Sequence, residues 1–189
     1  GWVKLLREEK SDHSTILDSV EEDISRLSEI SERFSKIGSK PKLNSLSLNE
    51  LISEVSAYMN SRLPQNSRIN ITHTGDNNMK IKGDWVLLRW AVENLVKNAI
   101  DAVGIETGKI SLIISKSDNG VQLDLRDSGK GINRLNWKNI FRPGYSSKQR
   151  GWGLGLSLTK RIVEEIHGGS IRVLSSKLGE TIFRLIFPK

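Results

Sequence analysis

The stretch GWGLGLSLTKRIVEEIHGG, residues 151–169, decides the fold of this 189-residue chain. Gly151, Gly153 and Gly155 stand just before a sequence whose apolar residues have helical spacing. A helix N-terminus offers unpaired backbone N–H groups and a partial positive charge, and glycines let an anion approach the backbone closely. The stretch therefore predicts a helix start that binds phosphate. It is not a Rossmann fingerprint, because no strand leads directly into it, and no Lys-Ser or Lys-Thr follows the glycines as a P-loop requires.

A second helix, expected from Gly83-Asp84 to about Val103, carries Asn94 and Asn98. Residues four apart share one helix face. Buried amides without partners are costly, so such a pair needs a purpose. Two explanations stay open at this point: a polar network or cap in the core, or oxygen ligands for a hard cation such as Mg²⁺, which combines few protein oxygens with phosphate oxygens and water.

Two loops between these helices add further polar groups. The segment DSGKGI, residues 127–132, follows a predicted strand. The Asp127 carboxylate is suited to accept a hydrogen bond from an exocyclic amine, as on adenine, although a plain Asp-Ser-Gly turn has the same sequence. The segment IFRPGYSSK, residues 140–148, is suited to form a lid that brings Lys148 to a phosphate, or an ordinary surface loop.

The order of these four segments within about one small domain decides between the alternatives. Together they resemble the ATP-binding catalytic domain of sensor histidine kinases, within the ATPase superfamily shared with gyrase, Hsp90 and MutL. The resemblance covers residues 45–189 and is nearest to the nitrogen-regulation type, because FRPGYSSK is similar to that group's Phe-x-Pro-Gly-Phe-Thr-Thr-Lys. It implies a Bergerat-type two-layer α/β sandwich that binds ATP and Mg²⁺.

The resemblance also implies roles for individual residues. Asn98, with Asn94 beside it, is the expected Mg²⁺ ligand, and Asp127 is the expected adenine anchor. The expected catalytic residues are Asn94, Asn98 and Lys148, with Glu93 as a hypothetical base. A neutral Asn94, where the ATPases of the superfamily align an acid, favours transfer to histidine over activation of water. The expected nucleotide-binding residues are Asn98, Asp127, Gly129, Gly131, Ile132, Phe141, Ser147, Lys148, Gly151, Gly153, Leu154, Gly155 and Leu156.

Sequence periodicity independently predicts an α+β class. Helices are expected from Ser47, a plausible N-cap with Glu50 three residues on, to about Met59, and over 154–167. His167, at the end of the latter, is expected to be partly cationic. Strands are expected over 69–74, 109–116, 121–126, 170–175 and 181–187, with a hairpin turn at 118–120. We interpret the strands as antiparallel, with the helices on one face of the sheet.

The N-terminal part, residues 1–40, has a different pattern. Apolar residues recur every three or four positions from Ile16 to Ile37, which predicts a long helix, and residues 38–47 are expected to form a linker. The resemblance implies part of a dimerisation hairpin that pairs with a second copy in a homodimer. None of His13, His73 and His167 has the neighbours of the family's phosphoacceptor. We therefore expect that histidine upstream of Gly1, and no autophosphorylation by this chain alone.

Composition limits the remaining possibilities. The net charge is +7, but Lys and Arg are scattered without interleaved aromatics, so we expect a basic solvated surface and no nucleic acid partner. The absence of cysteine and of a membrane-spanning run fits a cytoplasmic setting. The resemblance implies a response-regulator receiver domain as partner and a membrane-anchored parent sensor. Two alternatives remain: a nucleotide-binding or dimerisation module without kinase activity, and a serine kinase of the anti-sigma-factor type.

Overall fold

The computed structural model describes residues 41–75, 78–104, 107–148 and 152–188, together with Leu17, Val20 and Ile24. The chain divides into two compact units, Gly1–Pro41 and Lys42–Lys189. Leu17, Val20 and Ile24 are helical. The rest of the predicted N-terminal helix, His13 and Gly151 lie outside the described residues.

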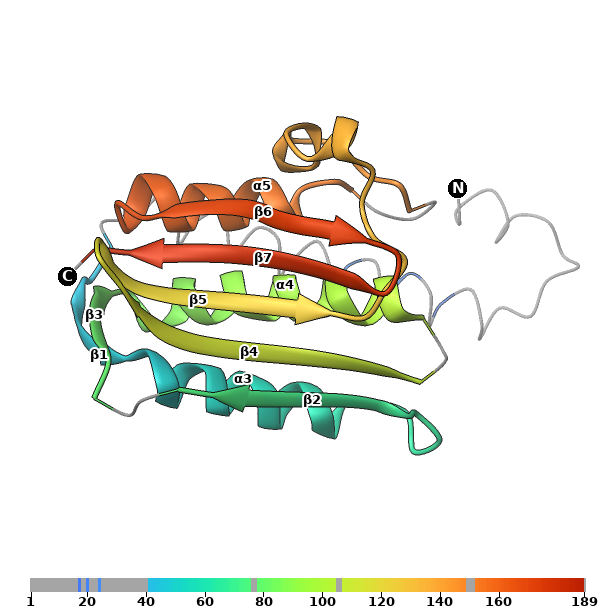
Figure 1. Ribbon diagram of the computed structural model, residues 1–189, viewed down its shortest axis with the longest axis horizontal. Helices are drawn as coiled ribbons and strands as arrows, with labels where there is room; N and C mark the ends of the chain where they lie inside the picture. The colour runs from blue at the N-terminus through green and yellow to red at the C-terminus, as the bar shows by residue number, and fades with distance from the viewer. Residues whose placement is uncertain are drawn as a thin grey trace, which may run out of the picture. The chain divides into compact units, whose positions relative to one another are not determined.

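The larger unit is built on a five-stranded sheet (Figure 1). The strands follow the spatial order β2-β4-β5-β7-β6. Their bounds are Ile69–Thr74 for β2, Gly108–Ser117 for β4, Gly120–Asp127 for β5, Ser170–Lys177 for β6 and Glu180–Phe187 for β7. Each predicted strand is therefore present, with ends that differ by at most two residues.

The pairing of β2 corrects the antiparallel interpretation. The pairs β4–β5, β5–β7 and β6–β7 are antiparallel, but β2 runs parallel to β4. A long helix lies between β2 and β4 in the sequence and carries the chain back across the sheet, so the next strand starts from the same end. The sheet is therefore mixed.

The α-helices cover one face of this sheet (Figure 1). Their bounds are Leu48–Ser61 for α3, Trp85–Val103 for α4 and Gly155–Arg161 for α5. The core between the layers consists of fully buried aliphatic side chains, among them Leu88 and Val96 of α4 and Leu112, Leu123 and Leu185 of the sheet. Each such side chain contributes about 1.5–3 kcal/mol through its removal from water. The predicted α+β two-layer fold is confirmed.

Side-chain caps fix where α3 and α4 begin. The Ser47 hydroxyl accepts the Glu50 N–H at 3.2 Å. The Asp84 carboxylate accepts the N–H groups of Val86 and Leu87 at 3.1 and 3.2 Å. These bonds satisfy orphan donors of the first turn, so the helices start where the sequence predicts.

A second, two-stranded sheet was missed. Strands β1 (Asn44–Ser47) and β3 (Lys80–Gly83) pair antiparallel, so the end of the expected linker is in fact a strand. Four residues carry too little periodicity to predict a strand whose partner lies far along the chain. The Lys42 N–H also donates to Asp84 at 3.1 Å, which attaches the start of this unit to the N-terminus of α4.

The last helix and His167 differ from expectation. Helix α5 ends at Arg161 and continues as a π-helical turn, η3 (Ile162–Ile166). His167 is buried, and its Nε2 accepts the Asp84 N–H at 3.0 Å while Nδ1 donates to the Ile162 carbonyl at 2.7 Å. Burial lowers the pKa of His167 below 6.5 despite the opposing effects of the Ile162 bond and of Asp84. The expectation of a partly cationic ring was wrong, because Nε2 must keep its lone pair.

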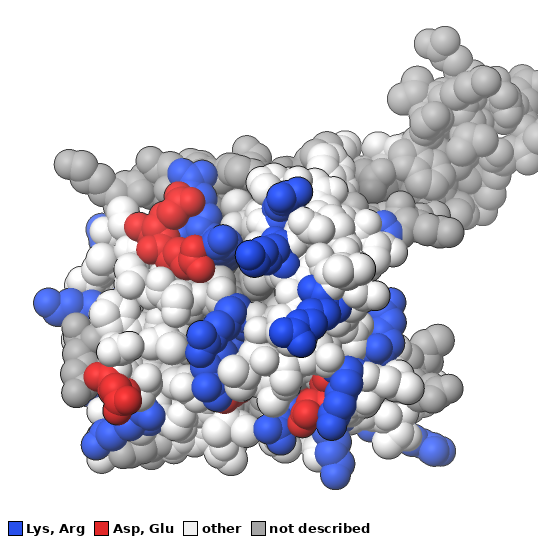
Figure 2. Space-filling model, turned by 45° about the horizontal axis from the view of Figure 1, so that its top comes forward, with Lys and Arg blue, Asp and Glu red and all other residues white. Residues whose placement is uncertain are grey.

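Charged side chains are spread over the surface. Figure 2 shows one face on which Lys and Arg lie in separate places with uncharged surface between them, and Asp and Glu occupy fewer places. Such a distribution gives a positive field that favours small anions. Among the described helices, none combines the length and apolar character that a membrane span requires.

Candidate active site

The predicted site segments all contact helix α4. Asn94 contacts α5, Asn98 and Asp101 contact the loop that ends at Lys148, and Ala102 contacts the loop after β5. Asn98 follows Asn94 by four residues, and Asp101 and Ala102 follow Asn98 by three and four, so these positions share one side of the helix over successive turns. Segments far apart in the sequence are thereby brought to one strip of α4.

Asp127, the last residue of β5, lies at one end of this strip. Its side chain is 3% exposed, and its Oδ1 accepts the Gly129 N–H at 2.9 Å. Burial raises the pKa of Asp127 from 3.8 to about 6, and the bond from Gly129 partly offsets this rise. The described bond uses one carboxylate oxygen, so the other remains for a donor brought by a ligand.

The glycines after Asp127 allow the backbone of this loop to lie close to the backbone of α4 and of the β6–β7 hairpin. A Cβ on Gly129 would lie 2.6 Å from the Ala102 carbonyl carbon of α4. Gly131 has φ +80°, and a Cβ there would lie 2.7 Å from the Lys177 carbonyl oxygen. The Gly179 N–H donates to the Gly129 carbonyl at 2.9 Å. The loop is therefore clamped between α4 and the β6–β7 hairpin.

Ile132, the last predicted residue of this loop, is also held through its backbone. Its N–H donates to the Ser176 hydroxyl at 2.7 Å, and its carbonyl accepts the Trp137 indole N–H at 3.0 Å. Trp137 follows the short helix η1 (Arg134–Asn136).

Asn94 joins α4 to the start of α5. Its Nδ2 donates to the Thr159 hydroxyl at 2.9 Å, and that hydroxyl donates to the Gly155 carbonyl at 3.0 Å. A Cβ on Gly155 would lie only 2.3 Å from Asn94 Oδ1, so glycine is required for this contact. Leu154 and Leu156, which flank Gly155, are only partly buried. Thr159 is the one buried residue of α5.

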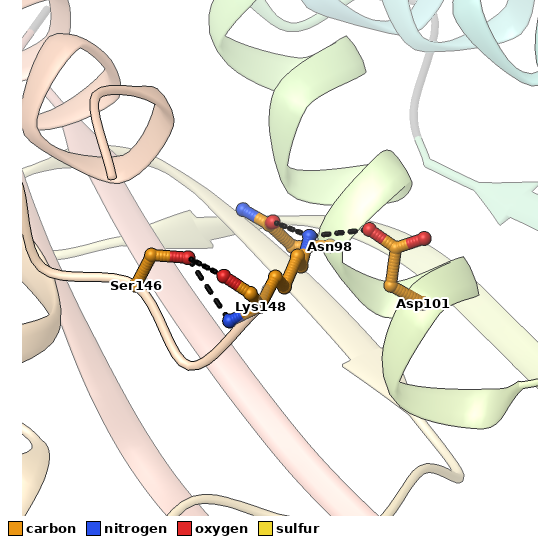
Figure 3. A network of polar contacts seen from close by, with 4 residues as sticks. All are labelled: Asn98, Asp101, Ser146 and Lys148. Atoms are coloured by element: carbon orange, nitrogen blue, oxygen red, sulfur yellow. Dashed lines mark hydrogen bonds and ion pairs between the residues drawn. The ribbon is translucent and has the colours of Figure 1, made fainter. Parts of the chain in front are cut away.

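Lys148 reaches across to α4 (Figure 3). Its Nζ donates to Asn98 Oδ1 at 3.0 Å and forms an ion pair with the Asp101 carboxylate. The Ser146 hydroxyl accepts the Lys148 backbone N–H at 3.0 Å. The Asn98 amide oxygen therefore already faces a position where a cation is bound.

The Phe-Pro-Gly segment links this loop to the sheet and to α5. Phe141, at the end of η2 (Asn139–Phe141), packs edge to face on Phe183 of β7 with 6.3 Å between ring centroids. Lys160 Nζ lies 5.9 Å from the Phe141 ring centroid. The Gly144 N–H donates to the Gly153 carbonyl at 3.1 Å, which closes the base of the loop. Ser147 is exposed.

Glu93 points to a different side of α4. Its Oε1 lies 2.8 Å from Arg89 Nε, and Arg89 Nη1 lies 2.7 Å from Glu54 of α3. Arg89 also lies over the Tyr58 ring. The contacts of Glu93 are therefore toward α3, whereas Asn94 and Asn98 face α5 and the Lys148 loop.

The donor set limits which cation the site can hold. Within the described ranges, no group of three or more His, Asp or Glu side chains is placed to bind a metal ion. A cation near Asn98 would depend on one or two side-chain oxygens and on oxygens of a ligand or water. This fits Mg²⁺, which keeps several waters and binds nucleotide phosphates.

Sequence reasoning missed Asp101, Ala102 and Thr159 as site residues. Asp101 follows Asn98 by three residues, and this spacing on a helix was a usable signal. Thr159 follows Gly155 by four residues and returns its hydroxyl to the glycine carbonyl. The Ala102 contact depends on how a loop packs against α4, and no local pattern predicts it.

Comparison with known proteins decides the family. Residues 83–189, which include α4, Asp127, Lys148 and α5, match the family of histidine kinase-, DNA gyrase B- and HSP90-like ATPases. The chain belongs to this family. The match begins just before α4 and runs to the end of the chain, so it contains the whole candidate site.

The relatives within this family are histidine kinases. Sporulation kinase A of Bacillus subtilis (strain 168) is 30% identical over 193 residues, covering 100% of this chain and 31% of the relative. Sensor histidine kinase ZraS of Escherichia coli (strain K12) is 36% identical over 147 residues, covering 77% of this chain and 31% of the relative. Less than a third of each relative is thus represented here.

Solved structures agree with this assignment. The catalytic domain of histidine kinase ThkA is 30% identical with a TM-score of 0.70, covering 78% of this chain and 95% of that chain. ThkA solved in complex with the response regulator TrrA is 26% identical with a TM-score of 0.77, covering 100% of this chain and 56% of that chain. The family, relatives and neighbours together identify the ATP-binding catalytic region of a sensor histidine kinase.

Proposed function

We propose that this chain binds Mg·ATP on the α4 strip and that the whole protein transfers the γ-phosphoryl group to a histidine. A response-regulator aspartate then takes the phosphoryl group. The observation that carries the proposal is the convergence on α4 of a buried carboxylate loop, at Asp127, and a cation-binding amide, at Asn98.

Asp127 is the adenine anchor in this proposal. Oδ1 is held by Gly129, and Oδ2 accepts a hydrogen bond from the exocyclic amine of adenine. A buried charged acceptor gives a stronger and more selective bond than an exposed one. The Gly129 and Gly131 backbone then supplies a flat surface beside the base.

The phosphate end combines Asn98, Lys148 and the glycine-rich start of α5. Asn98 Oδ1 is the protein ligand for Mg²⁺, with Asn94 positioned against Gly155 to support it. When bound, Mg²⁺ neutralises charge on the phosphate oxygens. Lys148 adds a positive charge near the γ-phosphate, and Ser147, Leu154 and Leu156 line the approach.

The reaction requires positioning more than acid–base chemistry. The lone pair of a histidine ring nitrogen forms the N–P bond. The bond from the γ-phosphorus to the oxygen bridging the β- and γ-phosphates breaks, and ADP leaves with that electron pair. Asn94 is neutral and cannot activate water. Glu93 is paired with Arg89 on the α3 side, so we assign it no proton-transfer role.

The test uses the complete parent protein and γ-labelled ATP with Mg²⁺. We expect acid-labile label on a histidine upstream of Gly1, and transfer from it to an added receiver domain. This chain alone should bind ATP without incorporating label. Binding without transfer in the complete protein would support the non-catalytic module instead, and label on a serine of an added protein would support the serine kinase. Steady phosphate release by this chain alone would indicate an ATPase.

The homodimer is proposed on separate grounds. Leu17 and Ile24 are each helical, are seven residues apart in the sequence, and expose 53% and 57% of their surface. Apolar residues at heptad spacing pack against a second helix. We expect sedimentation of the parent protein as a dimer, and a shift toward monomer in Leu17→Asp/Ile24→Asp. An unchanged dimer would place the contact elsewhere.

The relatives support the partner that we propose, and the need for ATP supports the compartment. ThkA has been solved with its response regulator TrrA, which supports a receiver domain as the partner here. We propose that this region works in the cytoplasm, where ATP is available, whether or not the parent is anchored to a membrane.

A further inference from the structure

Asp101 has no role in the proposal so far, yet it makes a direct contact in the site. The Lys148 ammonium lies between Asn98 Oδ1 and the Asp101 carboxylate, which come from one turn of α4 (Figure 3). One oxygen belongs to the residue proposed to hold Mg²⁺. The other carries a full negative charge three residues further along the same helix face.

The Lys148 ammonium and a Mg²⁺ ion would compete for these two oxygens. If Mg²⁺ takes the Asn98 oxygen, the Lys148 ammonium must leave, because two cations at one oxygen repel each other strongly. A divalent ion is also attracted more strongly to the Asp101 carboxylate than a lysine is. The displaced ammonium then moves toward the nearest remaining negative charge, which is the nucleotide phosphate.

We propose that Asn98 and Asp101 form one cation site that Lys148 and Mg²⁺ occupy in turn, with Asp101 as the positioning residue that holds Lys148 on α4 until the nucleotide arrives. The proposal rests on the proposed Mg·ATP function. It assigns to Asp101 both the resting contact of Lys148 and the negative charge that faces the metal after exchange.

The geometry of Lys148 suits such an exchange. Its backbone N–H is bonded to the Ser146 hydroxyl, so the main chain is held while the side chain turns about its four-carbon stem. The Lys148 and Asp101 side chains are 47% and 53% exposed. Exposed pairs are weak, which allows the pair to break when ATP binds.

The test is a double-mutant cycle on ATP binding, measured by calorimetry with the full chain in EDTA and in excess Mg²⁺. In EDTA, D101N frees Lys148 for the phosphates, so we expect ATP affinity to rise by about two- to five-fold. The enhancement of affinity by Mg²⁺ should shrink by a similar factor. In the K148Q background, the effect of D101N should be smaller by about the same factor, because no ammonium is left to release.

Glu165→Gln is the matched control, because Glu165 forms an exposed ion pair with Arg161 at 3.2 Å outside the site. It should leave both affinities unchanged. If D101N changed ATP affinity equally in the wild-type and K148Q backgrounds, the inference would be overturned. The effect would then reflect only the removal of charge repulsion between Asp101 and the phosphates. Failure of the wild-type chain to bind Mg·ATP would instead overturn the proposed function.

A second measurement observes the contact itself. In spectra of lysine side-chain ammonium groups, assigned with K148Q, the nucleotide-free chain should show a protected Lys148 signal. The signal should be lost in D101N and should shift on addition of Mg²⁺ and ADP. A Lys148 signal unaffected by D101N would overturn the inference.

Discussion

The two ends of the α4 strip are built in different ways. At the adenine end, Asp127 is 3% exposed and its loop is fixed by backbone contacts to Ala102 and Lys177. At the phosphate end, Lys148 and Asp101 are about half exposed and meet through flexible side chains. The first arrangement resists change, whereas the second can exchange one cation for another.

This difference matches the two tasks of a nucleotide site. The base is the same whether ATP or ADP is bound, so its contacts can be rigid and prepared before binding. The phosphates and metal change during the reaction, so their ligands must rearrange. We expect substitutions at the adenine end to affect stability and affinity strongly, and substitutions at the phosphate end to affect mainly the response to Mg²⁺.

The largest expected effect is a loss of stability that is greater in Gly131→Ala than in Gly144→Ala. Both have φ +80°, but a Cβ on Gly131 would meet the Lys177 carbonyl, whereas Gly144 has open space. Gly144→Ala should cost about 1–2 kcal/mol of unfolding free energy through backbone strain alone. Gly131→Ala should cost about 2–5 kcal/mol, because overpacking adds to the same strain. Urea unfolding measures both, and equal losses would contradict a clamped adenine end.

Asp127→Asn should produce the next largest effect. If the Asn oxygen keeps the Gly129 bond, its NH₂ faces the adenine amine, so two donors oppose each other. We expect ATP affinity to fall about 10- to 100-fold, as for the loss of a charged hydrogen bond. Calorimetry with Mg²⁺ measures this. GTP, which has a carbonyl oxygen in place of the 6-amine of adenine, should bind weakly to the wild-type chain. Equal ATP affinity in variant and wild type would remove Asp127 from recognition.

Changes of pH should act on the same carboxylate in two opposite ways. Its folded pKa of about 6 exceeds 3.8, so the folded state binds the proton more tightly and the unfolding free energy falls as pH rises from about 4 to about 6. Above pH 6, nucleotide-free Asp127→Asn should be more stable than wild type by about 1–3 kcal/mol. Wild-type stability that does not decline across this range, relative to the variant, would contradict the raised pKa.

Nucleotide binding should show the reverse dependence, because protonation makes the carboxyl group a much weaker acceptor for the amine. With a pKa of about 6, roughly one tenth of Asp127 is ionised at pH 5, so affinity should fall about tenfold between pH 7 and pH 5. The ratio of wild-type to Asp127→Asn affinity removes the titration of the phosphates. A constant ratio would show that the protonation state of Asp127 does not matter.

Glu93→Gln should have the smallest effect. Gln can still accept from Arg89, and Arg89 keeps Glu54, so the unfolding free energy should fall by no more than about 1 kcal/mol. Mg·ATP affinity and transfer to histidine should stay within about two-fold of wild type, because a two-fold change is about 0.4 kcal/mol. Loss of transfer with intact binding would restore Glu93 as a catalytic base.

Most of the elements could be predicted because their signals are local. Ser47 and Asp84 mark helix starts through their own caps, and the strands alternate apolar and polar residues. The sequence could not predict the parallel pairing of β2 with β4 or the pairing of β1 with β3. Each pairing depends on residues far apart in the chain. The neutral state of His167 depends on its burial and on the backbone N–H of Asp84, which also lies far away in the chain.

The site residues divide in the same way. Asn94, Asn98, Asp127 and the glycines follow spacings that the sequence displays. The ion pair of Lys148 with Asp101 and the bond of Asn94 to Thr159 depend on how a loop and α5 fold back onto α4. Resemblance to a family therefore predicts the residues that belong to its motifs. The residues whose contacts depend on how the chain folds back are found only from the structure.

The most direct test of the central claim is a crystal structure of this chain with Mg²⁺ and a non-hydrolysable ATP analogue. The account predicts the adenine amine within hydrogen-bond distance of the Asp127 carboxylate, Mg²⁺ on Asn98 Oδ1, and the Lys148 ammonium on a phosphate oxygen. An analogue bound away from α4, or with its base remote from Asp127, would contradict it.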